Sequence, residues 1–453
     1  MNLANKIKVL MVRSFKFFLV VTTFFLTGAC QQSATKDEIA VTAYGIPAEG
    51  TLDPFRGEPF FQMQAVFNGD SRSLREPYLA VAVDGTILAL QNRPGLLRRS
   101  EDGGKTWGEI IEVPFGFMDS NFITDENTGD IIVLRLWDGN DRLWRSSDHG
   151  KTWREENIIL KPNELIKWIE QAGLMKRVSW NERGEGYGEN GKYTIHSNAS
   201  ESGITLRHGK KKGRLIVTST FRPHAPEHPS DRDPLEAIYS CAVYSDDGGA
   251  TWQVSGLFPE GYTEEAALTE LSDGRIYYNS RSCSGFYDKS LARELKPEEV
   301  MRREAWSYDY GHTWEDLKVS SVLPDGGGAD RGYGCKGGLV RLPVENRDIL
   351  IYSNTDAGPG AREKMTVWAS FDGGETWPVK RLIHEPRGAY SSLGAGRPGT
   401  PGEGLIYLLF EDRYADPRSS THPPDATMQV ARFNLSWILG GELTGNGMIP
   451  DWL

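Results

Sequence analysis

The segment Ser100-Glu-Asp102-Gly-Gly104-Lys-Thr-Trp107 decides the fold, because it is the first of five copies of one pattern. Every copy has the form S-x-D-x-G-x-T-W, where x is any residue. The other copies occupy residues 146–153, 245–252, 307–314 and 370–377. The interval between the second and third copies is the longest, so it could hold a further unit that lacks the motif.

The residue types in this motif are those of a tight turn. The aspartate can accept hydrogen bonds from backbone N–H groups, the glycine tolerates a positive φ, and the tryptophan can pack beneath the loop. Runs typical of β-strands precede the copies, as at residues 238–244 and 365–369. We therefore interpret the motifs as structural turns in β-hairpins and not as catalytic groups.

The spacing of the motifs is typical of a β-propeller, in which each repeat supplies one blade of four short strands. We predict an all-β fold, a six-bladed β-propeller of four-stranded antiparallel blades with the motifs at hairpin turns. The composition agrees, because 50 glycines and 11% aromatic residues favour a turn-rich β structure.

The composition also excludes several classes of protein. Hydrophobic residues make up 39% and charged residues 25% of the 453 residues, which excludes a disordered chain and a multi-span membrane protein. The formal net charge is −11, which argues against nucleic acid and anionic membrane surfaces as partners.

The amino terminus has the pattern of a secretion signal. Four basic residues precede an apolar run at residues 17–26, which is short for a membrane span. The following Thr-Gly-Ala-Cys30 resembles a bacterial lipobox, although an ordinary secretion signal is the alternative. We predict a signal peptide at residues 1–29, acylation of Cys30, a polar tether at 30–50 and the propeller at 51–453. The protein would be secreted and held at the bacterial cell envelope only through this lipid anchor.

The remaining cysteines, Cys241, Cys283 and Cys335, show neither a disulfide framework nor the spacing of a zinc site. The histidines form no HExxH motif, and no nucleotide-binding fingerprint occurs. We expect no metal and no cofactor.

The five motifs resemble the Asp-box, or bacterial neuraminidase repeat. From about Arg75 to Trp437 the chain also resembles the sialidase (exo-α-neuraminidase) family. Asp-box propellers include hydrolases, receptors and assembly factors, so the functional residues must be compared one at a time.

This resemblance implies three arginines that bind a carboxylate. Arg75, followed by Glu76-Pro77 and a strand, matches the first arginine of the family. Arg281 follows a strand that begins after an Asp-Gly turn, and Arg362 precedes the last Asp-box. A guanidinium group is always charged and can pair with a carboxylate through two hydrogen bonds.

The resemblance also implies a nucleophile and a base. Tyr390, in Ala-Tyr-Ser-Ser-Leu, matches the tyrosine that attacks the anomeric carbon, a departure from the usual two carboxylates. Glu265 matches the general base that a phenol needs, with Glu264 as the alternative by one position. Glu411 matches the glutamate that supports the first arginine, so we expect it to pair with Arg75.

One element of the family pattern is missing. The acid/base aspartate of sialidases lies on a loop before the first Asp-box, whereas here the corresponding stretch, residues 88–100, contains no acidic residue. Asp119, in a stretch that resembles the border of the family's substrate pocket, is our hypothesis for the proton donor. The alternative is that Asp119 only caps a turn.

Two insertions are expected at the rim. Residues 163–172 carry apolar residues at i, i+3, i+4 and i+7, which predicts a short amphipathic helix. Residues 283–303 form a long connection near Arg281 that would influence the choice of aglycone.

Together these patterns predict a monomeric, retaining exo-glycoside hydrolase that releases a terminal carboxylated sugar, α-linked sialic acid, from glycans. One alternative is a hydrolase of another acidic sugar, an ulosonic or uronic acid. The other is a catalytically silent propeller that binds carbohydrate through the carboxylate clamp.

Overall fold

Short strands account for most of the regular structure in the computed structural model. It describes residues 42–43, 45–69, 74–116, 121–136, 141–161, 193–223, 238–283, 300–326, 334–357, 362–412 and 426–453. These residues belong to the compact unit Ile39–Leu453. Cys30, Asp119, the expected helix at 163–172 and most of the connection at 283–303 lie outside the described residues and stay predictions.

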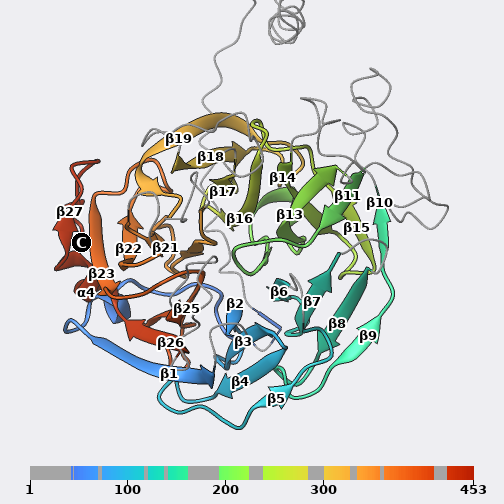
Figure 1. The fold of residues 1–453 in the computed structure, drawn as a ribbon, viewed down its shortest axis with the longest axis horizontal. Helices are drawn as coiled ribbons and strands as arrows, with labels where there is room; N and C mark the ends of the chain where they lie inside the picture. Colours follow the sequence, from blue (N-terminus) through green and yellow to red (C-terminus); the bar gives the residue numbers. More distant parts are fainter. Residues whose placement is uncertain are drawn as a thin grey trace, which may run out of the picture. The chain divides into compact units, whose positions relative to one another are not determined.

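The described strands form six sheets, arranged around a common centre as the blades of a propeller (Figure 1). The prediction of a six-bladed all-β propeller is therefore confirmed. The first blade contains β2 (Arg75–Val81), β3 (Ile87–Arg93), β4 (Leu96–Ser100) and β5 (Ile111–Glu112), and the second contains β6 (Asn121–Thr124), β7 (Ile131–Arg135), β8 (Arg142–Ser146) and β9 (Arg154–Glu156). The third contains β10 (Ile159–Lys161), β11 (Tyr193–His196), β12 (Ile204–Thr205), β13 (Leu215–Pro223), β14 (Tyr239–Ser245) and β15 (Thr251–Val254).

The second half of the ring is built in the same way. The fourth blade contains β16 (Thr263–Glu270), β17 (Ile276–Ser282), β18 (Met301–Ser307) and β19 (Glu315–Pro324). The fifth contains β20 (Gly338–Arg341), β21 (Leu350–Thr355), β22 (Met365–Ser370), β23 (Val379–His384) and β27 (Glu442–Leu443). The sixth contains β24 (Ser391–Ala395), β25 (Ile406–Asp412), β26 (Ala426–Phe433) and β1 (Phe61–Gly69). The described helices are η1 (Asp53–Arg56), η2 (Gly209–Lys211) and α4 (Leu435–Leu439), and none of them is long enough to cross a membrane.

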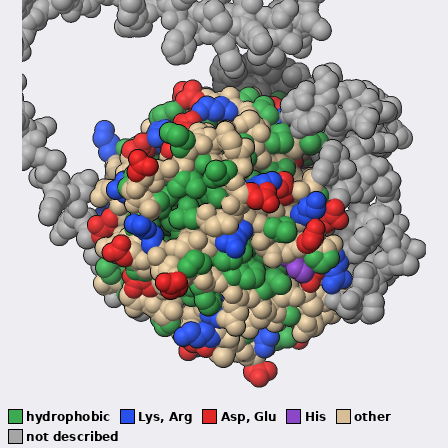
Figure 2. All heavy atoms as spheres, turned by 90° about the vertical axis from the view of Figure 1, so that its left-hand side faces the viewer, with side chains coloured by type: hydrophobic (Ala, Val, Ile, Leu, Met, Phe, Trp, Pro, Cys, Tyr) green, Lys and Arg blue, Asp and Glu red, His purple; other side chains and the backbone are tan. Residues whose placement is uncertain are grey.

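The two ends of the propeller chain meet in the sixth blade. The outer strand β1 pairs antiparallel with β26, from Phe61 opposite Phe433 to Gly69 opposite Ala426. The first strand of the domain therefore completes the last sheet, which closes the ring. Near the carboxyl terminus β27 extends the fifth blade. It lies on the left-hand side of Figure 1, which is the side that faces the viewer in Figure 2, where apolar side chains are interspersed with charged ones.

The hydrophobic core lies between neighbouring blades, in six clusters of buried residues. Successive side chains of a strand point to opposite faces of its sheet. Tyr277 thus packs toward the fifth blade and Tyr278 toward the third. Both faces of each sheet are buried, which is why central strands such as β17 carry buried residues at every position.

Each Asp-box has the geometry of a closed turn. In the first box, Asp102 accepts hydrogen bonds from the N–H of Thr106 at 3.0 Å and from its hydroxyl at 2.6 Å. The Ser100 hydroxyl donates to Asp102 and accepts from the N–H of Gly104, whose φ is 79°. The same contacts recur in the other four boxes, so the interpretation as structural turns is confirmed.

The tryptophans of the boxes connect the blades. Trp252, Trp314 and Trp377 are buried in the clusters between their own blade and the preceding one. The sixth blade carries no box, because its outer strand comes from the amino-terminal end of the domain. The idea that the long interval between the second and third boxes holds an extra unit is wrong, because its described strands from β10 to β14 belong to one sheet.

Strand direction places the boxes far from the candidate site. Each box follows the third strand of its blade, which runs parallel to the first strand because neighbours are antiparallel. The end of a third strand and the beginning of a first strand therefore lie at opposite ends of the propeller. Arg75 and Tyr390 lie at or just before the beginnings of the first strands β2 and β24.

Asp102→Asn tests the contribution of a box to stability. Burial raises the pKa of Asp102, but hydrogen bonds from Thr106 and Ser100 outweigh it and lower the pKa to about 2. A carboxylate with a lowered pKa stabilises the fold above its ordinary pKa of about 4, and this stabilisation is lost as the pH falls toward 2. We expect the variant to lose about 1 kcal/mol of unfolding free energy at pH 6.

Urea denaturation at a series of pH values measures this effect. Between about pH 4 and pH 2 the variant should lose less stability than the native chain, because it lacks the titrating group. Glu442→Gln, an exposed position on β27, is the matched control and should change neither quantity. Equal acid sensitivity of Asp102→Asn and the native chain would contradict the assignment.

Candidate active site

Six predicted site residues form one connected cluster at a single end of the propeller. They come from the first, fourth, fifth and sixth blades and are Arg75, Glu265, Arg281, Arg362, Tyr390 and Glu411. Each contacts at least one other member of the cluster. These residues are separated by up to several hundred positions in the sequence, so only ring closure brings them together.

Tyr390 lies at the centre of this cluster. Its side chain is 2% exposed, and its hydroxyl donates to Oε1 of Glu265 at 3.3 Å. Arg75 and Arg362 lie over its ring, with their Cζ atoms 5.3 and 5.0 Å from the ring centre. A phenol becomes a good nucleophile when an adjacent base removes its proton, and surrounding cations favour the resulting negative charge.

A β-bulge positions Glu265. Between Glu264 and Ala267 the register of β16 against β17 shifts, so that residues 265 and 266 face the single residue Ser280. Glu265 itself has a left-handed φ of 46°. In a regular strand the side chains of neighbouring residues would point to opposite faces, but a bulge changes their direction.

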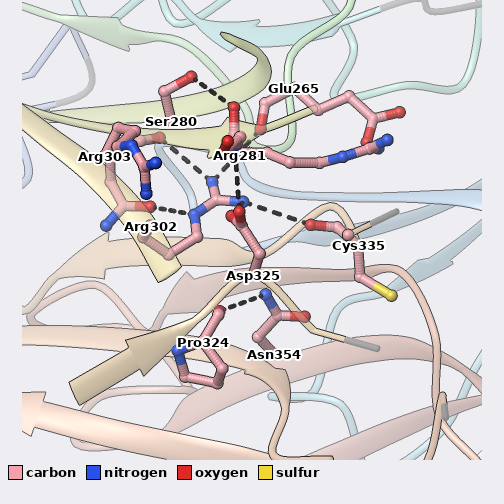
Figure 3. A network of polar contacts seen from close by, with 12 residues as sticks. Glu265, Ser280, Arg281, Arg302, Arg303, Pro324, Asp325, Cys335 and Asn354 are labelled. Atoms are coloured by element: carbon pink, nitrogen blue, oxygen red, sulfur yellow. Dashed lines mark hydrogen bonds and ion pairs between the residues drawn. The ribbon is translucent and has the colours of Figure 1, made fainter. Parts of the chain in front are cut away.

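As a result, both glutamates contact Arg281. This arginine is fully buried and forms an ion pair with Glu265, which lies beside it in Figure 3. Its Nη2 also lies 3.4 Å from Oε1 of Glu264. Glu265, and not Glu264, contacts the Tyr390 hydroxyl. Glu264 instead accepts a hydrogen bond from Asn198 at 3.4 Å. The geometry thus favours Glu265 over its neighbour as the partner of Tyr390.

Glu411 connects Arg75 to the backbone of Tyr390. Its fully buried carboxylate accepts from the N–H of Glu76 at 2.9 Å and lies 3.9 Å from Nε of Arg75. Its own N–H donates to the carbonyl of Tyr390 at 3.0 Å. The expected pairing of Glu411 with Arg75 is present in this geometry.

Arg362 occupies the segment before β22. Its Nη2 donates to the carbonyl of Gly334 at 3.0 Å, and its carbonyl accepts from the N–H of Gly388. The three arginines differ in exposure, because the Arg281 side chain is fully buried while that of Arg75 is 27% exposed. The three guanidinium groups come from different blades, and that of Arg281 is enclosed by Glu264 and Glu265.

A buried ion pair that the sequence analysis missed lies beside Tyr390. Lys336 is 2.7 Å from Oε2 of Glu76, donates to the Tyr78 hydroxyl at 3.0 Å and lies 5.6 Å from the ring centre of Tyr390. Burial raises the pKa of Glu76, but the charges of Lys336 and Arg75 outweigh it and lower the pKa to about 2. The lowered pKa favours the ionised form of Glu76 at neutral pH, which does not suit a proton donor.

The connection from β3 to β4 is the two-residue turn Pro94-Gly95, which carries no carboxyl group. Asp119, the predicted donor, lies outside the described residues, two positions before the first residue of β6. Among the described residues, no group of three or more histidine, cysteine or acidic side chains is arranged to hold a metal ion.

Comparisons with known proteins agree with the fold. Two short family models match the chain, "BNR-Asp box repeat" at residues 143–156 and "BNR/Asp-box repeat" at residues 243–254. A sialidase of Micromonospora viridifaciens is 29% identical over 91% of this chain, and one of Bacteroides fragilis is 26% identical over 69%. The chain is an Asp-box propeller whose sequence is similar to those of sialidases. It spans 60% and 56% of the lengths of these two relatives.

Solved structures show the same fold at lower identity. The Hadza microbial sialidase Hz136 has a TM-score of 0.57 and 21% identity, with 80% of this chain and 66% of that chain covered. The intramolecular trans-sialidase from Ruminococcus gnavus, solved with oseltamivir carboxylate, has a TM-score of 0.56 and 16% identity, with 82% and 97% covered. These similarities concern the fold of the propeller.

Arg281→Met tests the electrostatics of this candidate site. Removal of the guanidinium leaves two neighbouring buried carboxylates, Glu264 and Glu265, without their shared partner. We expect a loss of about 3 kcal/mol in the free energy of unfolding, measured by urea denaturation at pH 7. Adding Glu264→Gln should recover part of that loss, because one of the two charges is gone.

Arg275→Met provides the matched control. Arg275 pairs with Asp273 at 2.7 Å on the surface, and exposed pairs contribute less than about 1 kcal/mol. If Arg281→Met destabilised the protein no more than Arg275→Met, the buried charge cluster would not have the role described.

Proposed function

We propose that this protein is a retaining exo-glycoside hydrolase that releases a terminal, α-linked sialic acid from glycans. The observation that carries the proposal is the contact of the Tyr390 hydroxyl with Glu265 inside a group of three arginines. The sialidases among its relatives support the choice of sugar.

Arg75, Arg281 and Arg362 would bind the carboxylate of the sugar. A carboxylate in this position explains why the nucleophile is a phenol. A carboxylate nucleophile would repel the negative charge of the bound sugar, whereas neutral Tyr390 does not. Glu411, through Arg75, and Glu265, through Arg281, hold two of the three guanidinium groups in place.

In the first step, the Tyr390 oxygen attacks the anomeric carbon while Glu265 takes the phenolic proton. The bond from the anomeric carbon to the leaving oxygen breaks, and that oxygen receives a proton from an acid. In the second step, water attacks the anomeric carbon from the face opposite Tyr390. The phenolic oxygen leaves and recovers its proton from Glu265, and the water loses a proton to the conjugate base of the acid. Two inversions leave the configuration of the sugar retained.

Neither Glu76 nor the turn from β3 to β4 provides a suitable acid. Glu76 is ionised at neutral pH, and the turn from β3 to β4 has no carboxyl group. We propose Asp119 as the donor, on the basis of its place in the sequence before β6. The short turn also favours a second candidate function, a propeller that binds acidic carbohydrate through the arginines without hydrolysing it.

Tyr390→Phe tests the nucleophile. The variant keeps the ring between the arginines and loses only the hydroxyl, so we expect hydrolysis of aryl sialosides to fall at least a thousandfold, while affinity for a carboxylated sugar analogue changes less than threefold. The release of the aryl group and calorimetric titration of the analogue measure the two effects. Uronyl aryl glycosides, tested in parallel, distinguish sialic acid from other acidic sugars.

Tyr407→Phe is the matched control. Tyr407 is buried between the sixth and first blades, and its hydroxyl has no hydrogen-bond partner among the described residues. Removal of the Tyr407 hydroxyl should leave the turnover rate within twofold of the native value. If the native protein bound the acidic analogue but hydrolysed none of the glycosides, the binding propeller would replace the hydrolase.

Asp119→Asn tests the donor. Activated aryl glycosides have leaving groups that need little protonation, so the variant should retain their hydrolysis. Hydrolysis of natural sialyl linkages should fall at least a hundredfold, because the sugar leaving group needs the proton. The rates of hydrolysis of both substrate types are measured at the same pH. An equal loss of rate on both types, or no loss on either, would exclude Asp119 as the acid.

A further inference from the structure

A fully buried arginine lies beneath the bulge that carries Glu265. Arg302, the second residue of β18, contacts Asp325, which directly follows β19, at 3.5 Å (Figure 3). Both side chains are fully buried. Their contacts converge on the residues that form the site.

The guanidinium group of Arg302 donates to three segments of the chain. Its Nε donates to Oδ1 of Asn279 at 2.6 Å, and its Nη1 to the carbonyl of Cys335 at 3.3 Å. Its Nη2 donates at 3.3 Å to the carbonyls of Asn279 and Glu265. Arg302 therefore connects β17, the segment that enters β20, and the bulged residue of β16.

The contact with Glu265 matters because the bulge interrupts the regular ladder. A buried carbonyl that loses its partner costs about 1–3 kcal/mol, so the bulge needs donors from elsewhere. Arg302 and the hydroxyl of Ser200 supply them. They hold the Glu265 peptide in its left-handed conformation, from which the carboxylate reaches Tyr390.

Asp325, the partner of Arg302, contacts the backbone next to Arg281 and next to Lys336. Its carboxylate accepts from the N–H of Ser282 at 3.0 Å, next to Arg281. Its carbonyl accepts from the N–H of Cys335 at 2.7 Å. The Arg302–Asp325 pair thus links the backbones beside the base, beside the buried arginine of the clamp, and ahead of Lys336.

We propose that Arg302, supported by Asp325, is a positioning residue that holds Glu265 against Tyr390 and Arg281 during turnover. This inference rests on the proposed function. A buried ion pair is weak evidence for stability, since well-packed apolar residues often replace it without loss. Arg302 donates to the backbone carbonyl of Glu265, so the pair can fix the position of this base. A displacement of about 1 Å in a catalytic group can reduce the rate about a hundredfold.

The test is Arg302→Ala, assayed with an activated aryl sialoside. We expect kcat to fall about a hundredfold while KM stays within threefold, because the base moves and the clamp remains. Added guanidinium chloride, at a concentration that leaves the fold intact, should restore at least tenfold of kcat by filling the cavity with the missing group. A purely structural role would lower the melting temperature without this rescue.

Arg432→Ala is the matched control. Arg432 is also a buried arginine, but it donates to the carbonyl of Gly103 in the first Asp-box, at the opposite end of the propeller. Its kcat should stay within twofold of the native value. A value of kcat for Arg302→Ala within threefold of the native protein, or an equal loss in Arg432→Ala, would overturn the inference.

Two further measurements test the positioning role even if Arg302→Ala does not fold or the proposed function is wrong. If Arg302→Ala does not fold, Arg302→Lys retains the charge opposite Asp325 but cannot span the three carbonyls, and its kcat should fall while its KM does not change. If the native protein hydrolyses no substrate, the proposed function fails. Crystal structures of the native protein and Arg302→Ala then decide the positioning role. The Glu265 carboxylate should leave the Tyr390 hydroxyl in the variant, and an unchanged contact would refute the role.

Discussion

Burial of both faces of every sheet is the constraint on which this structure depends. Each of the six hydrophobic clusters takes its side chains from two neighbouring blades, so no blade has a complete core of its own. The ring must close for the first and last blades to be covered, and β1 on β26 achieves that closure. The Asp-box tryptophans strengthen the same contacts, because those of the third to fifth blades are buried against the preceding blade.

The candidate site lies at the end of the propeller where the inner strands depart from regular β geometry. Glu76 and Glu265 both have left-handed φ values, of 61° and 46°, near the beginnings of their inner strands. Such conformations cost free energy in residues other than glycine and persist only where the surroundings hold them. Here the surroundings are buried charges, and Arg281, Lys336 and Arg302 each contact a residue or backbone group of these strained positions.

The balance of charge at this end has a chemical consequence. Glu76 remains ionised because Lys336 and Arg75 outweigh the cost of its burial. Asp325 shows the opposite balance, since burial raises its pKa to about 6 against the lowering effect of Arg302 and Arg303. Burial and neighbouring charges thus shift the pKa values of these two carboxyl groups in opposite directions.

The sequence by itself determined the architecture and the chemical types at the site. The Asp-boxes encode turns through local hydrogen bonds between residues at most four positions apart, so their pattern is readable without a structure. The arginines, Tyr390 and Glu265 were predictable from motifs. Only the tertiary structure shows that Glu265, and not Glu264, contacts Tyr390, because a bulge and a left-handed residue change the direction of these side chains. Tertiary structure alone also showed that Lys336 and Arg302 contact residues of the site. Ring closure and strand packing bring these distant residues together, and no local sequence pattern records such contacts.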